Sequence, residues 1–348
     1  MRLVRWSAYL LLVLLLVYGY RSYSLFTHFG RDIALPPSSE QYYHLEPAFC
    51  LDACRSIDTS IVSQDEDGVY VVNFDRVKNL RVHDKRVYFP GTIGQLALTH
   101  YVRLKRYGNQ EDKKAFLANV DWLAGNIRES GCWDNPIDIS VTPGRVVKQP
   151  WCSGLAQGVA ISALVRAYTL TQDDKYLGVA LHAARVFQPG VPDSVTSRIR
   201  PDAVCYEEVM DAGHPTCVLN GYIFAIFGLY DLTRVSSDPQ IKAFYDAGMQ
   251  SLITLTPQFD SGYWSYYSLD SVRSLANHYA IASPSYQRIH AEMYTALARM
   301  DPAPVLEQYR QVHTDYAHRG WFNIVVIPLY LMYQDFSLAY KWFRQLKE

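Results

Sequence analysis

The chain has 348 residues, of which 49% are hydrophobic and 19% are charged, and its formal net charge is −1. This length and apolar content suffice for a large buried core in one or two domains. Without a basic excess, nucleic acid is not expected as a partner, and an anionic ligand must be attracted by local positive charge. Tyrosine is abundant, with 27 residues, and its flat ring with a polar tip suits sugar stacking, interfaces and membrane boundaries.

The first 21 residues have the layout of an export signal. Arg2 and Arg5 precede an uncharged run, WSAYLLLVLLLVYGY, which ends before Arg21. The segment that follows matches a signal-peptidase site poorly, so we predict a single-pass membrane anchor at 1–21. The basic N-terminal side then places the rest of the chain on the non-cytoplasmic side, periplasmic or lumenal. A cleaved secretory signal is the alternative.

Six cysteines are compatible with disulfides in an exported chain: Cys50, Cys54, Cys132, Cys152, Cys205 and Cys217. Pairing between neighbours in sequence (50–54, 132–152 and 205–217) is the simplest arrangement, although other connectivities stay open. No C-x-x-C motif is present, so a zinc site is not expected.

A linker is expected at 22–60, where LPPSSEQ marks a break, and a small β region at 61–91. GVYVVNF (68–74) and KRVYFPG (85–91) are typical of strands. The acidic stretch QDEDG (64–68) is interpreted as a solvated turn, with a weak structural calcium site as the alternative. No other cofactor is expected.

From residue 92 to residue 348 the pattern is helical and repetitive. Four stretches each combine a helix rich in small residues, a polar turn and a second amphipathic helix, and the corresponding positions are Ala97, Ala163, Gly228 and Met293. A period of about 65 residues indicates stacked helical hairpins. We therefore predict a mainly α protein, an (α/α) toroid of helical hairpins with a small N-terminal β region. The apolar segment 321–333 contains Pro328 and suits a buried helix better than a membrane-associated one.

Several segments between residue 88 and about residue 315 carry a more specific pattern. They are YFPGTIGQLALTHY (88–101), WCSGLAQGVAISALVRAYTLTQDDKYL (151–177), VLNGYIFAIFGLYDL (218–232), Tyr267-Ser268-Leu269, and Tyr286 with His290. In order and spacing they resemble the D-glucuronyl C-5 epimerases of heparosan and heparan sulfate. The resemblance implies an isomerase that inverts C5 of D-glucuronate to L-iduronate within an acidic polysaccharide.

That reaction removes a proton from a carbon beside a carboxylate. It requires donors that neutralise the carboxylate, and proton-transfer groups on opposite faces of the sugar ring. The resemblance places the catalytic phenols at Tyr267 and Tyr286, with Glu208 assisting. Taken without the resemblance, either tyrosine is interpreted as a packing ring and Glu208 as an ion-paired loop acid.

One segment departs from the family pattern. The family has aromatic-Glu-Glu-Tyr-Pro where this chain has Tyr206-Glu207-Glu208-Val209-Met210, so a catalytic phenol of the family is replaced by Val209. Tyr206 or another ring then compensates, or the reaction runs between Tyr267 and Tyr286 with Glu208 assisting. An altered substrate and a loss of activity are the other interpretations.

Further residues are expected to bind the substrate, with Arg273 as the carboxylate clamp. The others are His290, Asn220, Gln157, Trp151 and Tyr206. Other roles stay open: packing for His290, capping of the following helix for Asn220, and loop fixing for Gln157 and Trp151.

Two other classes of function stay open beside the epimerase. A uronan lyase or hydrolase on the same toroid would share the first proton removal, and a membrane-anchored glycan-binding protein would keep the fold without catalysis. The expected partners are an acidic polysaccharide and the membrane, through the N-terminal segment. A homodimer, the exact uronan and its sulfation are not determined by the sequence.

Overall fold

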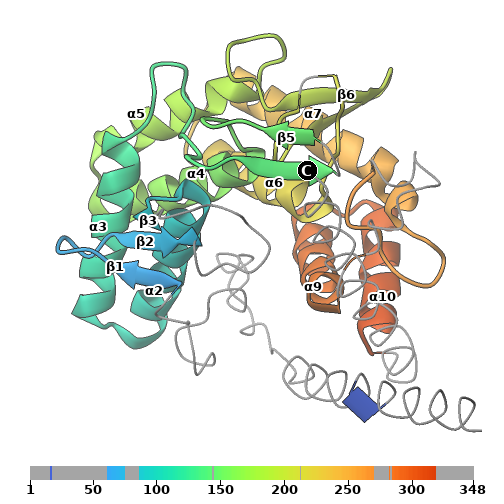
Figure 1. The fold of residues 1–348 in the computed structure, drawn as a ribbon, viewed down its shortest axis with the longest axis horizontal. Coiled ribbons are helices and arrows are strands. Elements are labelled where there is room, and N and C mark those ends of the chain that lie inside the picture. Colours follow the sequence, from blue (N-terminus) through green and yellow to red (C-terminus); the bar gives the residue numbers. More distant parts are fainter. Residues whose placement is uncertain are drawn as a thin grey trace, which may run out of the picture. The chain divides into compact units, whose positions relative to one another are not determined.

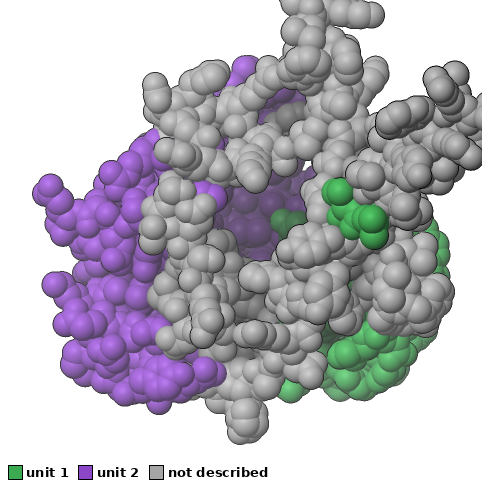
Figure 2. All heavy atoms as spheres, turned by 60° about the horizontal axis from the view of Figure 1, so that its bottom comes forward, with its two compact units in different colours: residues 1–39, 262–265, 281–348 green, residues 40–261, 266–280 purple. Residues whose placement is uncertain are grey.

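The computed structural model describes residues 16–17, 61–74, 86–142, 145–211, 213–269, 282 and 284–318. They belong to two compact units (Figure 2). The larger unit comprises Glu40–Ser261 and Tyr266–Ala280, and the smaller comprises Met1–Ser39, Gly262–Ser265 and Ile281–Glu348. The linker at 22–60, the segment 321–333 and nearly all of the predicted anchor lie outside the described residues.

The larger unit is built from three helical hairpins (Figure 1). Their helices are α2 (Pro90–Tyr107) with α3 (Gln110–Gly125), α4 (Gly154–Thr171) with α5 (Asp174–Ala183), and α6 (Leu219–Thr233) with α7 (Pro239–Leu255). Short 3₁₀ turns follow two of them, η3 (Ala184–Phe187) and η4 (Thr256–Phe259). These pairs agree with three of the predicted repeats, and the mainly α class is confirmed.

The first helix of each pair is the buried one. The repeat positions Ala97 and Ala163 have no exposed surface, and Gly228 is buried as well. Close approach explains the small residues: a Cβ added at Gly158 would lie 2.1 Å from the carbonyl oxygen of Phe224. Only glycine permits that backbone contact.

Helices α2, α4 and α6 run parallel. Near its start, α2 places Gly91 against Leu155 of α4, and further along the two helices Arg166 of α4 approaches the ring of Tyr101. Gly158 of α4 contacts the backbone of α6 at Phe224. Further along both helices, Arg166 of α4 forms an ion pair with Asp231 of α6. The amino-terminal ends of the three inner helices therefore lie on one side of the unit. This is the arrangement that a toroid requires, and its closure into a ring stays a prediction.

Three small antiparallel sheets accompany the helices. The first has the order β1 (Val62–Gln64), β2 (Tyr70–Asn73), β3 (Arg86–Val87), with Val72 opposite both Val62 and Val87. The others are hairpins, β4 (Ile139–Thr142) with β5 (Arg145–Val147), and β6 (Thr196–Arg200) with β7 (Ala203–Tyr206). β2 and β3 fall in the two predicted strand segments, whereas β1 and both hairpins had not been predicted.

Two disulfides join residues of the loops between hairpins, Cys132–Cys152 and Cys205–Cys217. Both confirm the pairing between neighbours in sequence. The third predicted pair, Cys50 with Cys54, lies outside the described residues.

The smaller unit contains the fourth predicted hairpin, α9 (Pro284–Met300) with α10 (Pro304–His318). Met293, the repeat position of this hairpin, is fully buried. Trp264 and Ala282 form an apolar cluster with Tyr316 of α10, and Tyr286 packs against that cluster.

Within the part of the chain that the structure describes, we find no helix with the length and apolar character needed to cross a membrane. The segments for which a membrane role was considered, 1–21 and 321–333, are not tested by this result.

Candidate functional site

The starts of α4 and α6 meet the loop that carries the two adjacent glutamates. The backbone N–H of Gly154, the first residue of α4, donates to the carbonyl oxygen of Glu207 at 2.7 Å. On α6, a Cβ added at Gly221 would lie 2.6 Å from Oε2 of Glu208. The absence of a side chain at both glycines thus lets this loop lie directly on the helix starts.

Glu207 anchors the loop. Its Oε2 accepts hydrogen bonds from the backbone N–H of Cys217 at 2.8 Å and from both the N–H and the hydroxyl of Thr216, at 3.2 and 3.1 Å. Its Oε1 accepts from the hydroxyl of Ser197. Burial raises the pKa of Glu207, although these donors act in the opposite direction. A side chain with this many partners holds the segment in place.

Glu208 is the opposite case. Its Oε2 is buried and has no hydrogen-bond partner among the described residues. Burial, and secondly the negative charge of Glu207, raise the pKa of Glu208 to about 7. A carboxyl group with that pKa exchanges its proton near neutral pH, as a general acid or base requires.

Asn220 directly precedes Gly221, the residue of α6 that Glu208 approaches, in the first turn of the helix. It is 4% exposed, and its Oδ1 has no hydrogen-bond partner among the described residues. The capping interpretation is wrong, because the residue at the N-cap position is Val218 and Asn220 is the second residue of the helix. An unpaired amide at a helix start can bind a ligand.

Tyr267 belongs to the same neighbourhood through its backbone. Its carbonyl oxygen accepts from the N–H of Leu219 at 3.0 Å, Ser268 forms a bridge with Val218, and the N–H of Leu269 donates to the carbonyl of Thr216 at 3.0 Å. The ring is half-buried. Residues 267–269 are thus aligned with the segment that leads into α6, so one predicted phenol and Glu208 belong to one unit.

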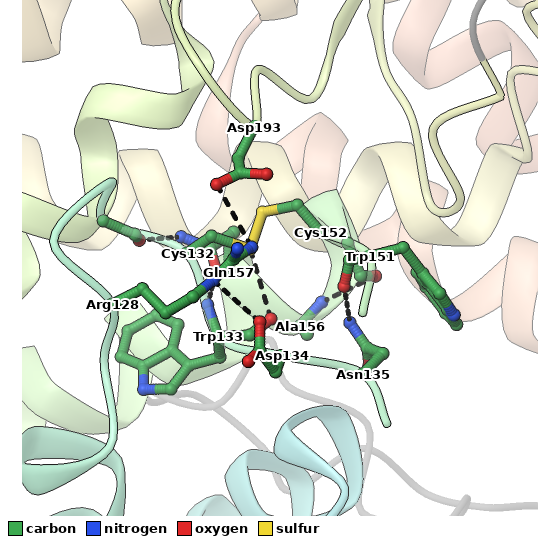
Figure 3. The surroundings of a disulfide bond; sticks show 12 residues. Arg128, Cys132, Trp133, Asp134, Asn135, Trp151, Cys152, Ala156, Gln157 and Asp193 are labelled. Atoms are coloured by element: carbon green, nitrogen blue, oxygen red, sulfur yellow. Dashed lines mark hydrogen bonds and ion pairs between the residues drawn. A yellow bond between two sulfur atoms is a disulfide. The ribbon is translucent and has the colours of Figure 1, made fainter. Parts of the chain in front are cut away.

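Trp151 and Gln157 hold loops around the Cys132–Cys152 disulfide (Figure 3). The indole N–H of Trp151 donates to the carbonyl of Ile137 at 2.7 Å. Gln157 has no exposed surface, and its amide donates to the carbonyls of Gly131 and Ala183 at 2.8 and 3.0 Å. These bonds support the loop-fixing role of both residues, so we leave them out of the proposed site.

Arg128 binds the same loop to its surroundings through ion pairs with Asp134 at 2.7 Å and Asp193 at 3.1 Å (Figure 3). Asn135 donates its amide N–H to the carbonyl of Trp151 at 2.9 Å. The disulfide loop is therefore a rigid support next to the start of α4.

Tyr206 lies in the core, which corrects its assignment to substrate binding. It is 1% exposed, its ring packs edge-on against Phe187 and Tyr222, and its hydroxyl donates to the carbonyl of Phe244. Burial raises the pKa of the phenol, which disfavours its ionised form. Tyr206 therefore does not supply the phenol that Val209 lacks.

Val209 fills an apolar cluster together with Val72, Phe74, Ile137 and Trp151. It is 6% exposed. The position of the missing phenol is thus used for packing between the loop and the small β region, and Glu208 is the ionisable side chain next to it.

In the smaller unit His290 is held by a neighbour that is distant in sequence. Its Nδ1 lies 2.8 Å from the hydroxyl oxygen of Ser265, and the backbone N–H of Ser265 donates to the amide oxygen of Gln287 at 2.9 Å. All three residues have no exposed surface. Nε2 of His290 has no partner among the described residues, and burial holds the pKa of His290 well below its usual range.

Tyr286 lies one turn before His290 on α9, and the ring centroids are 6.5 Å apart. Its ring is half-buried. Tyr286 belongs to the smaller unit and Tyr267 to the larger, so their action on opposite faces of one sugar stays a prediction. Arg273, the predicted carboxylate clamp, lies outside the described residues.

Sequence reasoning had missed Ser265 and Gln287. Gln287 precedes His290 by three residues, a helical spacing that places both on one face of α9. This spacing was a usable signal for Gln287. Nothing local in the sequence indicates that Ser265 would reach the same face.

The described residues contain no group of three or more His, Cys, Asp or Glu side chains that could hold a metal ion. At the predicted turn, Asp65 accepts from the N–H groups of Asp67 and Val69, at 3.0 and 2.8 Å, and from the hydroxyl of Tyr88 at 2.7 Å. Its carboxylate is therefore used to shape the turn.

Comparison with known proteins identifies a matching family and several relatives, of which two are described here. Residues 127–315 match the family model of the D-glucuronyl C5-epimerase C-terminus. A D-glucuronyl C5-epimerase of Caenorhabditis elegans is 29% identical over 256 residues, 69% of this chain and 40% of the relative. An uncharacterized protein of Methanocaldococcus jannaschii is 29% identical over 120 residues, 34% of this chain and 39% of that protein. The matches thus span about two fifths of either relative.

Proposed function

The chain belongs to the D-glucuronyl C5-epimerase family, and on this premise we propose that it inverts C5 of D-glucuronate to L-iduronate within a heparosan-like polysaccharide. The observation that carries the proposal is the buried Oε2 of Glu208, which lies against the start of α6 and has no hydrogen-bond partner among the described residues. It is an acid or base of suitable pKa that lies against Gly221.

The reaction begins with removal of the proton at C5, which lies next to the uronate carboxylate. The electron pair left at C5 is delocalised into that carboxylate, so the site must stabilise additional negative charge there. A proton is then returned to C5 from the opposite face, which gives the inverted sugar with the chain intact. No bond other than C5–H is broken and reformed.

We assign Glu208 to proton transfer at C5 together with the phenol of Tyr267, which belongs to the same unit, and the part of Tyr286 stays a prediction from the family resemblance. The pKa of Glu208, raised by burial to about 7, makes its carboxylate a stronger base than an ordinary glutamate while leaving it partly ionised at neutral pH. This assignment fits the replacement of the family phenol by Val209, because Glu208 directly precedes that position. His290 is the neighbour of Tyr286 on α9 and is assigned to its positioning.

The test is incubation with heparosan in deuterated water. Deuterium incorporated at C5, with chains of unchanged length and L-iduronate in the product, is the expected result. Shortened chains with an unsaturated, ultraviolet-absorbing end would instead identify a lyase, and binding without exchange would identify a non-catalytic glycan-binding protein.

A further inference from the structure

The β4–β5 hairpin has an inner and an outer face. Side chains two residues apart lie on the same side of a strand. Arg145 and Val147 of β5 are half-buried, whereas Val146 between them is 50% exposed. Ile139 of β4 is the partner of Val147 in the hairpin register and therefore shares its face. The inner face of the hairpin thus consists of Ile139, Val147 and Arg145.

The inner face of the hairpin contacts the residues that follow Glu208. Its two apolar side chains pack against the cluster that contains Val209. The guanidinium group of Arg145 donates a hydrogen bond to the carboxylate of Asp211 and forms an ion pair with it, although the two residues are 66 positions apart in the sequence. The hairpin therefore contacts the loop at the first and at the third residue after Glu208.

Glu208 lies between two attached points of the same loop. Before it, Glu207 accepts a hydrogen bond from the N–H of Cys217 at 2.8 Å. After it, Asp211 is paired with Arg145. Oε2 of Glu208 is buried and has no hydrogen-bond partner among the described residues, so no such bond at this atom holds the carboxyl group in place. Its burial therefore depends on the attachment of the loop on both sides.

The charged and titratable groups around Glu208 belong to three segments. Glu207 lies in the same loop, the segment 267–269 contributes the phenol of Tyr267, and the hairpin contributes Arg145 with its partner Asp211. The first four residues of α4 and of α6, GLAQ and LNGY, carry no charge. Burial, and secondly the charge of Glu207, raise the pKa of Glu208 to about 7. The main cause is thus the exclusion of water, which the loop position controls.

We propose that Arg145 is a positioning residue, whose ion pair with Asp211 attaches the β4–β5 hairpin to the loop and keeps the carboxyl group of Glu208 out of water against the start of α6. The inference rests on the proposed function for the role of Glu208 in proton transfer. The side chains of the pair are 31% and 19% exposed. An ion pair with this exposure contributes little to global stability, so its loss should change the site while the fold persists.

The test measures the pKa of Glu208 directly, and turnover beside it. The full chain is labelled with glutamate that carries carbon-13 in its side-chain carboxyl group and is titrated by nuclear magnetic resonance, with Glu208→Gln to identify the signal. Deuterium exchange at C5 of heparosan is measured from about pH 5 to about pH 9 on the same proteins. The titration needs no substrate, so it reports on the position of Glu208 whether or not the chain is active.

Five variants are compared with the original chain. Arg145→Gln and Asp211→Asn each break the ion pair, the double variant removes both charges, and Arg145→Lys keeps the positive charge. Lys148→Gln is the matched control, because it removes a cation directly after β5. Lys148 is 75% exposed and pairs with Asp138 at 2.7 Å, within the hairpin region and away from the loop contacts.

Arg145→Gln and Asp211→Asn should both lower the pKa of Glu208 from about 7 towards the ordinary value of about 4.3, because water reaches the carboxyl group. The change of rate with pH should move to lower pH with it, and turnover should fall by about 10- to 100-fold, as for a misplaced catalytic group. The double variant should be no worse than either single one, since all three lose the same interaction. Arg145→Lys should retain most of the turnover, and Lys148→Gln all of it.

A merely electrostatic or structural role gives different results. The field of the remaining charge would shift the pKa of Glu208 in opposite directions in the two single variants, upwards in Arg145→Gln and downwards in Asp211→Asn. That outcome, an unchanged pKa, or a pKa near 4.3 in the original chain would overturn the inference.

The two proposals can fail separately. Exchange by the original chain, with the pKa of Glu208 unchanged in Arg145→Gln, leaves the proposed function standing and removes the inference. The expected pKa shifts in a chain without exchange do the reverse. Far-ultraviolet circular dichroism verifies that each variant is folded, and Arg145→Ala replaces Arg145→Gln if the latter fails to fold.

Discussion

Ser265 and His290 are 25 residues apart, and the Ser265 hydroxyl oxygen lies 2.8 Å from Nδ1 of His290 in the interior of the smaller unit. Both residues have no exposed surface. The ring is enclosed by Tyr286 and His313, whose centroids lie 6.5 and 6.2 Å away. Burial, and secondly the proximity of His313, hold the pKa of His290 well below its usual range. The ring is therefore neutral in the folded protein.

A neutral buried histidine makes the protein less stable in acid. In the unfolded chain a histidine has a pKa of about 6.5, so as the pH falls below that value the unfolded state binds a proton that folded His290 refuses. The stability that His290 contributes is complete above about pH 6.5 and decreases by up to about 1.4 kcal/mol per pH unit below it, until the folded pKa is reached.

We expect His290→Gln to reduce the loss of melting temperature between about pH 7.5 and about pH 5. A glutamine can still bond to Ser265 but takes up no proton. His214→Gln, at an exposed histidine, should leave the pH dependence unchanged. An equal acid-induced loss in His290→Gln and in the original chain would show that His290 takes up its proton in the folded state.

Glu208→Gln should abolish most of the turnover. Loss of a general acid or base costs about 10²- to 10⁴-fold in rate. The pKa of Glu208 is raised to about 7, so the rate of the original chain should change with pH around that value. Any activity that remains in the variant should lack this change. Profiles of kcat/KM for C5 exchange, from about pH 5 to about pH 9, measure both effects.

The effect of Glu208→Gln on stability should be opposite to its effect on turnover, because the variant should gain stability. A folded pKa above the unfolded value of about 4.3 means that the contribution of Glu208 to stability is present below that value and is lost as the pH rises towards 7. The variant should therefore be as stable as the original chain in acid and more stable at about pH 8. A marked fall in melting temperature at pH 8 would show that Glu208 is structural.

Glu207→Gln is the matched comparison at the adjacent residue. The Glu207 carboxylate accepts hydrogen bonds from Ser197, Thr216 and Cys217. The glutamine amide would place its own N–H₂ donor opposite some of these N–H and O–H groups, which then lose their acceptor. We expect a loss of about 1–3 kcal/mol in unfolding free energy, the cost of leaving buried polar groups unsatisfied. Urea denaturation measures it. If Glu207→Gln and Glu208→Gln changed stability alike, the division of roles between the two glutamates would be wrong.

The helical hairpins could be predicted because their signal is local and repeated. Small residues at Ala97, Ala163 and Gly228 indicated which helix of each pair is buried, and the structure shows these positions without exposed surface or in backbone contact. The two disulfides could be predicted for a similar reason, since each joins cysteines on either side of a single loop.

The roles of individual site residues depended on contacts that the sequence does not encode locally. Tyr206 and Glu208 are two residues apart, yet the first is packed against Tyr222 and Oε2 of the second has no hydrogen-bond partner in the part of the chain that the structure describes. In an extended segment, residues two apart lie on the same side, so the sequence pattern could not assign different roles to Tyr206 and Glu208. The hairpins β4–β5 and β6–β7 were missed because their strands have only three to five residues, which leaves too short a stretch for the alternation that predicts strands.

The glycines of the inner helices give the most direct test of the packing. A Cβ at Gly158 would lie 2.1 Å from the carbonyl oxygen of Phe224, a backbone atom that cannot rotate away. Gly158→Ala should therefore push α4 and α6 apart and cost at least about 3 kcal/mol, the upper part of the range for overpacked cores.

Gly178→Ala is the control for helix propensity. Gly178 lies in the outer helix α5, and a Cβ there has no heavy atom within 4 Å. Alanine should stabilise the protein at this position by up to about 1 kcal/mol, because it favours the helix more than glycine does. Thermal unfolding of both variants separates the effects: a lower melting temperature is expected for Gly158→Ala and a slightly higher one for Gly178→Ala. Equal melting temperatures would mean that α4 and α6 do not pack as closely as described, and the first turn of α6 would lose its support beside Glu208.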